Sequence, residues 1–330
     1  MGLVGVAIAI PASAETLRVG LMLPRGMQEI VYLNGMFEQF KAEVESASES
    51  SLKVQLYYGG VLGKPDDRLN MVRRNVIQMT DASEGNYATI HRDIQVFSIP
   101  YLFPSREVAL AVLDGPVGNR VAEGIRVKTG IRVLGWWESA GFKHYSSNAP
   151  IREVSDFRGQ KFRVMSAVFS IPVTALGGIA ISLPMNELYI SLKTGVVDGQ
   201  DNAVAIFNMQ KFHEVQSHIT LDAHAYSFGP VGINEAFFRM LSEHERRIVT
   251  EAAHRAIAWN RRMSRQIDEE AIALARSKGV QVLELTERER AQLAVQAQPA
   301  VIDWLRGNLD DPSLIDALME ETARQTARLP

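Results

Sequence analysis

One arginine in the middle of the chain has the chemistry of an anion-binding residue. Arg163 lies in the short apolar segment Lys161–Met165, which we predict to be a strand. A guanidinium group binds a carboxylate through two parallel hydrogen bonds, a geometry that a lysine ammonium cannot reproduce. Side chains alternate along a strand, so Lys161 and Arg163 share one face. That face is either solvated or the wall of a cleft, and in the second case Arg163 is the leading candidate to bind a carboxylate.

A polar segment after a short apolar run supplies a second candidate. Asn202 ends the segment 198–202, which follows the apolar residues 195–197, and we predict a strand over 195–197. Ligands of α/β proteins bind at the carboxyl ends of strands, where the Asn202 amide and nearby helix-start N–H groups would meet a ligand oxygen. The alternative is that Asp201 or Asn202 only caps the following helix.

An aromatic and basic cluster supplies two more candidates. Trp136 and Trp137 precede the segment 142–144, which contains Lys143. Paired tryptophans are usually core residues, and the other interpretation is that Trp137 walls a ligand cleft. We expect the chain to cross between two lobes over 137–142, where Lys143 would add a second positive charge.

The composition argues against several other functions. The 330 residues include no cysteine, which excludes disulfides and thiolate nucleophiles. The 35 lysines and arginines and the 38 aspartates and glutamates give a net charge of −3. This charge does not indicate the basic surface that nucleic-acid-binding proteins have. His213 and His218 are five residues apart and share no helix face, and no glycine-rich phosphate or nucleophile motif is present. The sequence therefore predicts no catalytic residue, no metal site, no cofactor and no nucleic-acid partner.

The elements that position these residues alternate between strands and helices. Apolar residues alternate over 17–23 and 52–58, and helical spacing follows each of them, over 28–46 and 64–76. An apolar segment over 96–104, which contains two prolines, is predicted to be a buried strand that leaves the sheet into a loop, and the strand–helix order returns after it. This order predicts an α/β protein with a largely parallel sheet, and the length favours two domains.

The clearest predicted helix covers 242–278, which contains neither glycine nor proline. Its apolar residues from Val249 to Leu274 step by three and four. Such a helix would be about 55 Å long, so it would run across two lobes as a strut. A coiled-coil partner is the alternative, although no seven-residue seam is sustained.

The first residues have the pattern of a secretory signal peptide. An apolar stretch from Leu3 to Ile10 is followed by Pro11 and by the small residues 12–14, with cleavage expected after Ala14. No lysine or arginine precedes the apolar stretch, so a short buried strand or a frayed terminus is the alternative.

Several motifs, taken together in this order, resemble a known family. Over about residues 17–280 the chain resembles the DctP-type solute-binding proteins of TRAP (tripartite ATP-independent periplasmic) transporters. The matching segments are 59–63, 99–103, 112–115, 157–165, 176–178, 184–189, 194–202 and 211–216.

The resemblance implies a two-lobe periplasmic binding protein fold with a central cleft and a long helix spanning both lobes. It implies that Arg163 is the main carboxylate anchor and that Asn202 and Phe169 line the pocket. The partners would be the small and large integral membrane permease subunits. The expected function is capture in the periplasm of a dicarboxylate, a sugar acid or another carboxylate, without covalent chemistry. A ligand-sensing module for a signalling partner and an enzyme acting on an organic acid are the alternatives.

The chain departs from the family pattern at positions that affect the ligand. Many members carry arginine where this chain has Lys143, so a second bidentate carboxylate clamp is not predicted. Ala203 stands where the family often has proline. The segment 81–86 contributes a pocket side chain in relatives, which makes Ser83 and Glu84 further candidates.

The expected division of the chain follows from the same resemblance. It consists of a signal peptide (1–14), lobe I (15–138 and about 227–262), lobe II (139–226 and about 263–305) and a C-terminal helical segment (306–330).

Overall fold

The computed structural model describes residues 15–26 and 31–329. The predicted signal peptide lies outside the described residues. One mixed sheet of nine strands organises the described part of the chain, in the order β2-β1-β3-β8-β4-β7-β5-β6, with β9 paired to β8. The strands are β1 (Glu15–Gly20), β2 (Leu52–Tyr57), β3 (Met79–Thr80), β4 (Ile131–Ser147), β5 (Lys161–Val164), β6 (Ile179–Ser182), β7 (Gly199–Asn202), β8 (His218–Asn234) and β9 (Gln281–Glu284).

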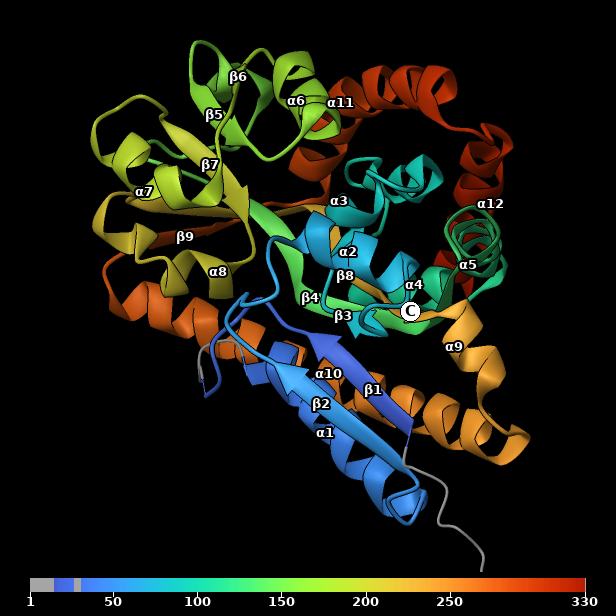
Figure 1. Cartoon of the computed structure of the whole chain (residues 1–330). Coiled ribbons are helices and arrows are strands. Elements are labelled where there is room, and N and C mark those ends of the chain that lie inside the picture. Colours follow the sequence, from blue (N-terminus) through green and yellow to red (C-terminus); the bar gives the residue numbers. More distant parts are fainter. Residues whose placement is uncertain (1–14, 27–30, 330) are drawn as a thin grey trace, which may run out of the picture.

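Two groups of elements lie on either side of the crossing made by the long strands β4 and β8 (Figure 1). We call the group of β1 to β3, α1 to α5 and α9 lobe I, and the group of β5 to β7, β9 and α6 to α8 lobe II. Helix α11 contacts α6 in lobe II and the 3-10 helix η1 in lobe I, and α12 packs on α4 and α5. The helices are α1 (Val31–Ala47), α2 (Pro65–Arg73), α3 (Glu84–Tyr87), η1 (Arg92–Ser98), α4 (Arg106–Leu113), α5 (Pro116–Thr129), η2 (Val154–Phe157), α6 (Ala167–Ala175), α7 (Met185–Lys193), α8 (Val204–Met209), η3 (Phe212–Glu214), α9 (Glu235–Met240), α10 (Glu243–Ser277), α11 (Glu287–Asn308) and α12 (Ser313–Arg328).

The long strands β4 and β8 run antiparallel and pass from one lobe into the other. Their pairing shifts register at three places, one of which lies between Glu138 and Gly141. Ala140 and Gly141 have φ angles of 62° and 74°, so the backbone bends there. This bend lies within the segment 137–142, where we expect the lobes to join. Helix α10 is fastened beside it, because the Glu138 N–H donates to Asn260 Oδ1 at 2.8 Å.

Helix α10 confirms the helix predicted over 242–278. Ser242 caps it by accepting the N–H of Glu245, and the Glu245 carboxylate accepts the N–H of Ser242 in return. Apolar residues of its first half pack on α1 and β4, and those of its second half pack on α8, so the helix underlies both lobes (Figure 1). Within the described ranges, no helix combines the length and the apolar character needed to cross a membrane.

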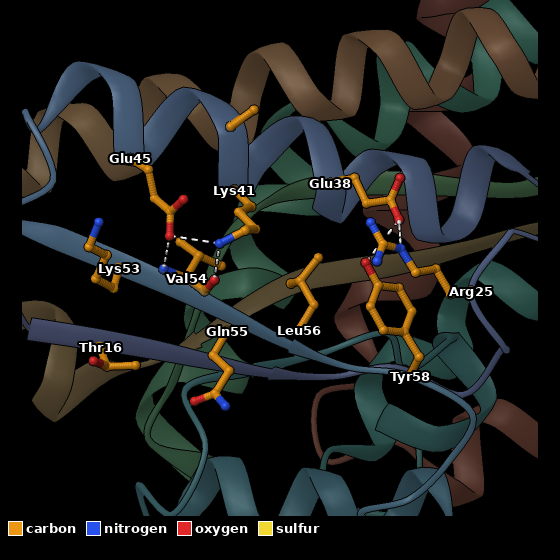
Figure 2. Close-up of a pocket in the computed structure, with 11 residues that line it drawn as sticks. Thr16, Arg25, Glu38, Lys41, Glu45, Lys53, Val54, Gln55, Leu56 and Tyr58 are labelled. Atoms are coloured by element: carbon orange, nitrogen blue, oxygen red, sulfur yellow. Dashed lines mark hydrogen bonds and ion pairs between the residues drawn. The ribbon is translucent and has the colours of Figure 1, made fainter.

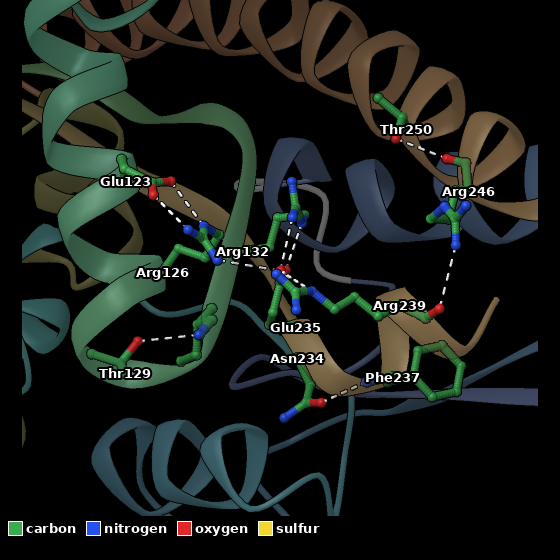
Figure 3. Close-up of polar contacts among 11 residues, drawn as sticks. Glu123, Arg126, Thr129, Arg132, Asn234, Glu235, Phe237, Arg239, Arg246 and Thr250 are labelled. Atoms are coloured by element: carbon green, nitrogen blue, oxygen red, sulfur yellow. Dashed lines mark hydrogen bonds and ion pairs between the residues drawn. The ribbon is translucent and has the colours of Figure 1, made fainter. Parts of the chain in front are cut away.

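The Glu235 carboxylate in lobe I is buried and is surrounded by several arginine side chains (Figure 3). Glu235 at the start of α9 accepts hydrogen bonds from Arg132 of β4 and Arg239 of α9, at 2.6 and 2.8 Å. Arg126 of α5 approaches the same carboxylate at 3.4 Å. Burial opposes ionisation, but the hydrogen bonds and charges of the arginines outweigh it and lower the pKa of Glu235. The Glu235 carboxylate thereby joins α9 to Arg126 of α5 and Arg132 of β4, which lie more than 100 residues earlier in the sequence.

The strand predicted within 96–104 is wrong, whereas the loop predicted to follow it is present. The segment begins in the 3-10 helix η1 and continues as a loop. Pro100 and Pro104 have no N–H to donate to a sheet, and Tyr101 has a φ of 56°, which an extended strand does not allow. The segment is buried nevertheless, because its apolar side chains join the core between the lobes and the C-terminal helices.

The strand predicted over 195–197 is also wrong, and the true strand begins four residues later. Gly195 has a φ of 73° and makes the turn that ends α7, so the valines after it are not in the sheet. Strand β7 is instead the polar segment Gly199–Asn202, placed between β4 and β5. A polar sequence is stable there because its side chains find hydrogen-bond partners on neighbouring strands.

Candidate carboxylate-binding site

Arg163 is a buried arginine with most of its hydrogen-bonding capacity unused. It lies on β5, which pairs with β6 on one side and β7 on the other, and the residue is 5% exposed. Its Nε donates to the Leu183 carbonyl at 2.9 Å, and this is the one hydrogen bond that its guanidinium makes to described residues. Burial lowers the pKa of Arg163 and the charge of Asp201 opposes this shift. A guanidinium stays protonated in proteins, so Arg163 offers a positive fork to an external anion.

Asn202 lies on the strand next to Arg163, at the end of a chain of buried amides. Arg163 is opposite Gln200 in the β5–β7 pairing, and Asn202 is two residues further along β7 on the same face. The Asn202 amide donates to Gln200 Oε1, and Gln200 Nε2 donates to Ser146 Oγ at 2.8 Å. The hydroxyl of Ser146 in turn donates to Gln216 Oε1 at 3.1 Å. These bonds orient the Asn202 side chain and leave its oxygen without a donor among the described residues.

Lys143, Glu84 and Phe169 form a second cluster, which bridges the lobes. The Lys143 Nζ lies 3.4 Å from Glu84 Oε1 of α3 in lobe I. The same nitrogen lies 4.1 Å from the ring centroid of Phe169 on α6 in lobe II, a cation–π contact. Glu84 and Lys143 therefore neutralise each other. The second carboxylate oxygen, Glu84 Oε2, is buried and has no hydrogen-bond partner in the described part of the chain.

Met165 connects this cluster to the arginine. It follows Arg163 by two residues, and its sulfur lies 3.4 Å from the Lys143 Nζ. Its methyl group also touches α3, since a Cβ added to Gly85 would lie 3.1 Å from Met165 Cε. No direct contact joins Arg163 to Lys143 among the described residues, but two residues along a strand span only about 7 Å. The two clusters are thus neighbouring parts of one region between the lobes.

A cavity of about 220 Å³ lies at this boundary. Glu84 and Gly85 of lobe I and Phe169 of lobe II line it, and Trp304 of α11 closes it. It is mainly apolar, with the Glu84 carboxylate as its charged group. Arg163, Asn202 and Lys143 do not line it, so the cavity adjoins the candidate site through Glu84 and Phe169 and does not contain the arginine.

A cavity of about 740 Å³ lies elsewhere and has a different character (Figure 2). It lies between α1 and β2, the edge strand of the sheet. Lys41 Nζ donates to the Val54 carbonyl at 2.6 Å, and the Val54 N–H donates to Glu45 Oε1 at 2.9 Å. These side chains satisfy the backbone N–H and C=O of Val54 at the open edge of β2, which opposes the addition of another strand there. The cavity contains none of the predicted site residues, so it is not the candidate site.

Trp137 and Ser83 are placed differently from the other predicted residues. Trp137 is 3% exposed and packs in the lobe I core with Phe37 and Met79. Ser83 begins α3, and its N–H donates to Asn86 Oδ1 at 3.2 Å. Ser83 therefore holds the short helix that presents Glu84, while Trp137 supports the strand that carries Lys143.

A buried charge network that the sequence analysis missed lies beneath the arginine. His224 Nδ1 lies 3.0 Å from Asp222 Oδ2, and its Nε2 lies 3.5 Å from Asp201 Oδ2. Asp222 also accepts the Tyr101 hydroxyl at 2.9 Å. Burial favours neutral imidazole, but the charge of Asp222 and the hydrogen bonds of both carboxylates raise the pKa of His224 to about 9. The alternation of Asp222 and His224 along an otherwise apolar β8 was the one available signal.

The same interactions act on the partner carboxylate. Burial alone would raise the pKa of Asp222, but the charges and hydrogen bonds of His224 and His144 lower it well below its usual range. The network therefore consists of a charged histidine between two carboxylates. It ties β7, β8 and the loop at Tyr101 together under the Arg163 strand.

Comparison with known proteins identifies the family. Residues 28–306 match the model of DctP, the bacterial extracellular solute-binding protein family 7. The chain belongs to this family. The C4-dicarboxylate-binding periplasmic protein DctP of Rhodobacter capsulatus is 29% identical over 256 residues, 77% of this chain and 76% of that protein.

Solved structures of DctP-family relatives have the same fold. A TRAP periplasmic solute-binding protein from Ochrobactrum anthropi is similar with a TM-score of 0.89 and 30% identity, covering 96% of this chain and 97% of that chain. The sugar acid binding protein of Advenella mimigardefordensis in complex with galactonate has a TM-score of 0.82 and 28% identity, covering 95% and 99%. The predicted family and the predicted two-lobe α/β fold are confirmed. As a DctP-family member, the chain is a solute-binding protein.

Proposed function

We propose that this DctP-family protein binds a small organic acid between its lobes, with Arg163 as the anchor of the carboxylate. The observation that carries the proposal is a guanidinium that is 5% exposed and has a single hydrogen bond to described residues. A buried charge without a partner is costly, so an anion from outside would satisfy both terminal nitrogens. Asn202, on the adjacent strand, would bind the ligand through its free amide oxygen.

The pairing of Lys143 with Glu84 favours a monocarboxylate that carries hydroxyl groups over a dicarboxylate. Lys143 is already neutralised by Glu84 at 3.4 Å, so Arg163 remains as the unpaired positive charge. A second ligand carboxylate at this cluster would face Glu84 and be repelled. A ligand hydroxyl would instead donate to Glu84 Oε2, which is buried without a partner in the described residues. The galactonate complex of the Advenella relative supports a hydroxy acid.

Closure of the lobes would complete the site. Met165 of lobe II touches Gly85 and Lys143, so the described structure has the lobes in contact around the candidate site. The bend of β4 at Ala140 and Gly141 is the natural hinge, because its backbone already departs from regular pairing. The closed surface would then be recognised in the periplasm by the small and large permease subunits of a TRAP transporter, and the segment 1–14 would direct export.

A thermal-shift screen of the mature protein against a panel of organic acids tests this proposal. A ligand at 100 times its Kd stabilises the folded state by about 2.7 kcal/mol, which raises Tm measurably. We expect hydroxy monocarboxylates to raise Tm more than dicarboxylates of the same length, and the corresponding amides and alcohols to have no effect. Stabilisation by uncharged analogues as strongly as by the acids would contradict the role of Arg163.

Delivery to a permease requires a separate experiment. Uptake of the identified acid into cells that carry the cognate permease subunits is expected to depend on this protein and on an ion gradient. Tight binding without any contribution to uptake would instead support the ligand-sensing alternative.

A further inference from the structure

A group of metal-ligand side chains lies outside the candidate carboxylate site, where η1 meets the corner between α11 and α12. His91 immediately precedes η1, Asp93 lies in its first turn, and Asp310 follows α11. One potential ligand atom from each residue lies within 4.8 Å of the other two. The chain thus brings together one imidazole and two carboxylates from segments 217 residues apart.

His91 is the observation that points to a ligand. The residue is 3% exposed, and neither ring nitrogen has a hydrogen-bond partner in the described part of the chain. Gly124 of α5 packs against the ring so closely that an added Cβ would lie 2.8 Å from Nε2. This contact fixes the ring with Nε2 facing Asp93 Oδ2 at 3.9 Å.

Asp93 is oriented in the way that metal-binding carboxylates commonly are. Its Oδ1 accepts the backbone N–H groups of Asp310 and Asp311, at 2.7 and 3.1 Å. These bonds fix the carboxylate and leave Oδ2 directed toward His91. They also hold the backbone of Asp310 in place, so the third side chain is presented to the same space.

We propose that His91, Asp93 and Asp310 bind a divalent transition-metal ion, with zinc as the ion that suits this ligand set best. Zinc takes imidazole nitrogen and carboxylate oxygen at about 2.0–2.2 Å, commonly with three protein ligands and a water. Tetrahedral ligands at that distance are about 3.3 Å apart. The separation of 3.9 Å between His91 Nε2 and Asp93 Oδ2 therefore needs to shorten by only about half an ångström.

Two cationic side chains approach the Asp310 carboxylate and compete with a metal ion. Lys128 of α5 forms an ion pair with Oδ2, and Arg92 Nε lies 3.7 Å from Oδ1. The Lys128 side chain is 48% exposed, so it can move into solvent when an ion binds. Because Lys128 competes with the ion for Asp310, removal of the Lys128 charge should strengthen metal binding.

The bound ion would cross-link lobe I to the C-terminal helices. Ile94 of η1 and Trp304 of α11 both line the cavity at the lobe boundary, so the ion would brace one wall of that cavity. The metal site does not depend on the identity of the organic acid, and it is tested without one.

Zinc competition with a chromogenic chelator, on the untagged full chain after removal of metal with EDTA, tests the proposal. We expect one Zn²⁺ per chain and a rise in Tm of a few degrees at saturating ZnCl₂. His91→Gln and Asp310→Asn should each weaken zinc binding at least tenfold. Lys128→Met should tighten it several-fold, which a merely structural role for these residues would not produce. His244→Gln, at an exposed histidine on α10, is the matched control and should leave zinc affinity unchanged.

Zinc affinity unchanged by both His91→Gln and Asp310→Asn would overturn the proposal, as would no binding by the wild-type chain at micromolar ZnCl₂. If His91→Gln fails to fold, the opposite effects of Asp310→Asn and Lys128→Met decide the outcome, because both positions lie at the surface. Equal zinc affinity in those two variants would also contradict the site.

Discussion

The two lobes each contain a buried arginine, and the two arginines differ in where their partners are. Arg68 in lobe I is fully buried, and all three of its guanidinium nitrogens bind protein groups. Its Nε donates to Thr80 Oγ1 at 2.9 Å, one terminal nitrogen donates to the Gly63 carbonyl at 2.7 Å, and the other donates to Asp81 Oδ1 at 2.6 Å. Arg163 in lobe II makes one such bond, to the Leu183 carbonyl.

Under the proposed function, this difference distinguishes an arginine that stabilises the fold from an arginine that binds the ligand. A buried guanidinium is stable only when its hydrogen bonds and charge are satisfied. For Arg68 the chain supplies these partners, including a carboxylate, so Arg68 contributes to the fold of lobe I. For Arg163 the charge of Asp201 acts on the guanidinium without forming an ion pair with it, and Asp201 Oδ2 lies 3.5 Å from His224 Nε2. Under the proposed function, the carboxylate of a ligand supplies the missing partner of Arg163.

Substitution of Arg68 should have the largest effect on stability. Arg68→Ala leaves the Asp81 carboxylate buried without its partner, so we expect the free energy of unfolding to fall by about 3–5 kcal/mol. Arg163→Ala should lower it by no more than about 1 kcal/mol, the usual worth of one hydrogen bond. Urea unfolding of both variants measures the contrast. Equal losses would remove the distinction between the two arginines.

Substitution of Arg163 should have the largest effect on binding. Arg163→Ala should weaken the acid by about 2–5 kcal/mol, or about 30- to 5,000-fold in Kd. Arg163→Lys should also weaken it at least tenfold, because an ammonium cannot form the bidentate pair. Calorimetric titration measures both. Lys161→Ala, which removes a charge two residues away on the same strand, is the matched control and should change Kd little.

Substitution of Glu84 tests which groups the ligand carries besides its carboxylate. Glu84→Gln keeps the shape of the side chain but removes its charge, and Lys143 then becomes an unpaired cation. We expect affinity for hydroxy monocarboxylates to fall about tenfold to a hundredfold, since hydrogen bonds to charged groups contribute about 1.5–3 kcal/mol. Affinity for dicarboxylates should rise in the same titrations. A parallel loss for both classes of acid would argue against direct ligand contact by Glu84.

The buried histidine beneath Arg163 should make stability depend on pH. The pKa of His224 is about 9 in the folded protein, above the ordinary value of 6.5. Its stabilisation is therefore fully present below pH 6.5 and is lost as pH rises through about 9. We expect this loss to be on the order of 1–3 kcal/mol in urea unfolding between pH 6 and pH 9.5. His224→Gln should remove most of this slope, and a variant with the wild-type slope would contradict the charged state of His224.

Much of the fold could be predicted because it depends on local sequence. The helix over 242–278 follows from an apolar stripe without helix breakers, and its cap is a Ser–Glu pair at the expected spacing. The strand β5, at Lys161–Val164, was predicted over 161–165 from alternation, and the burial of Arg163 on it is compatible with the cleft interpretation of that strand. These features can be recognised from residues that lie near one another in the sequence.

The remaining features depend on contacts between distant segments. Strand β7 is polar, and it is stable only because Gln200 reaches Ser146, 54 residues away in sequence. The pairing of Glu84 with Lys143 spans 59 residues. The residue pattern within one helix or strand does not indicate which distant residue its side chains will contact. The same reason explains why His91 looked like one of several scattered histidines.

A crystal structure of the protein with the acid identified in the thermal-shift screen tests the central claim most directly. We predict that the ligand carboxylate lies within about 2.7–2.9 Å of both terminal nitrogens of Arg163, with Leu183 still bound to Nε. An acid bound elsewhere, with the terminal nitrogens of Arg163 in contact only with water, would contradict the account.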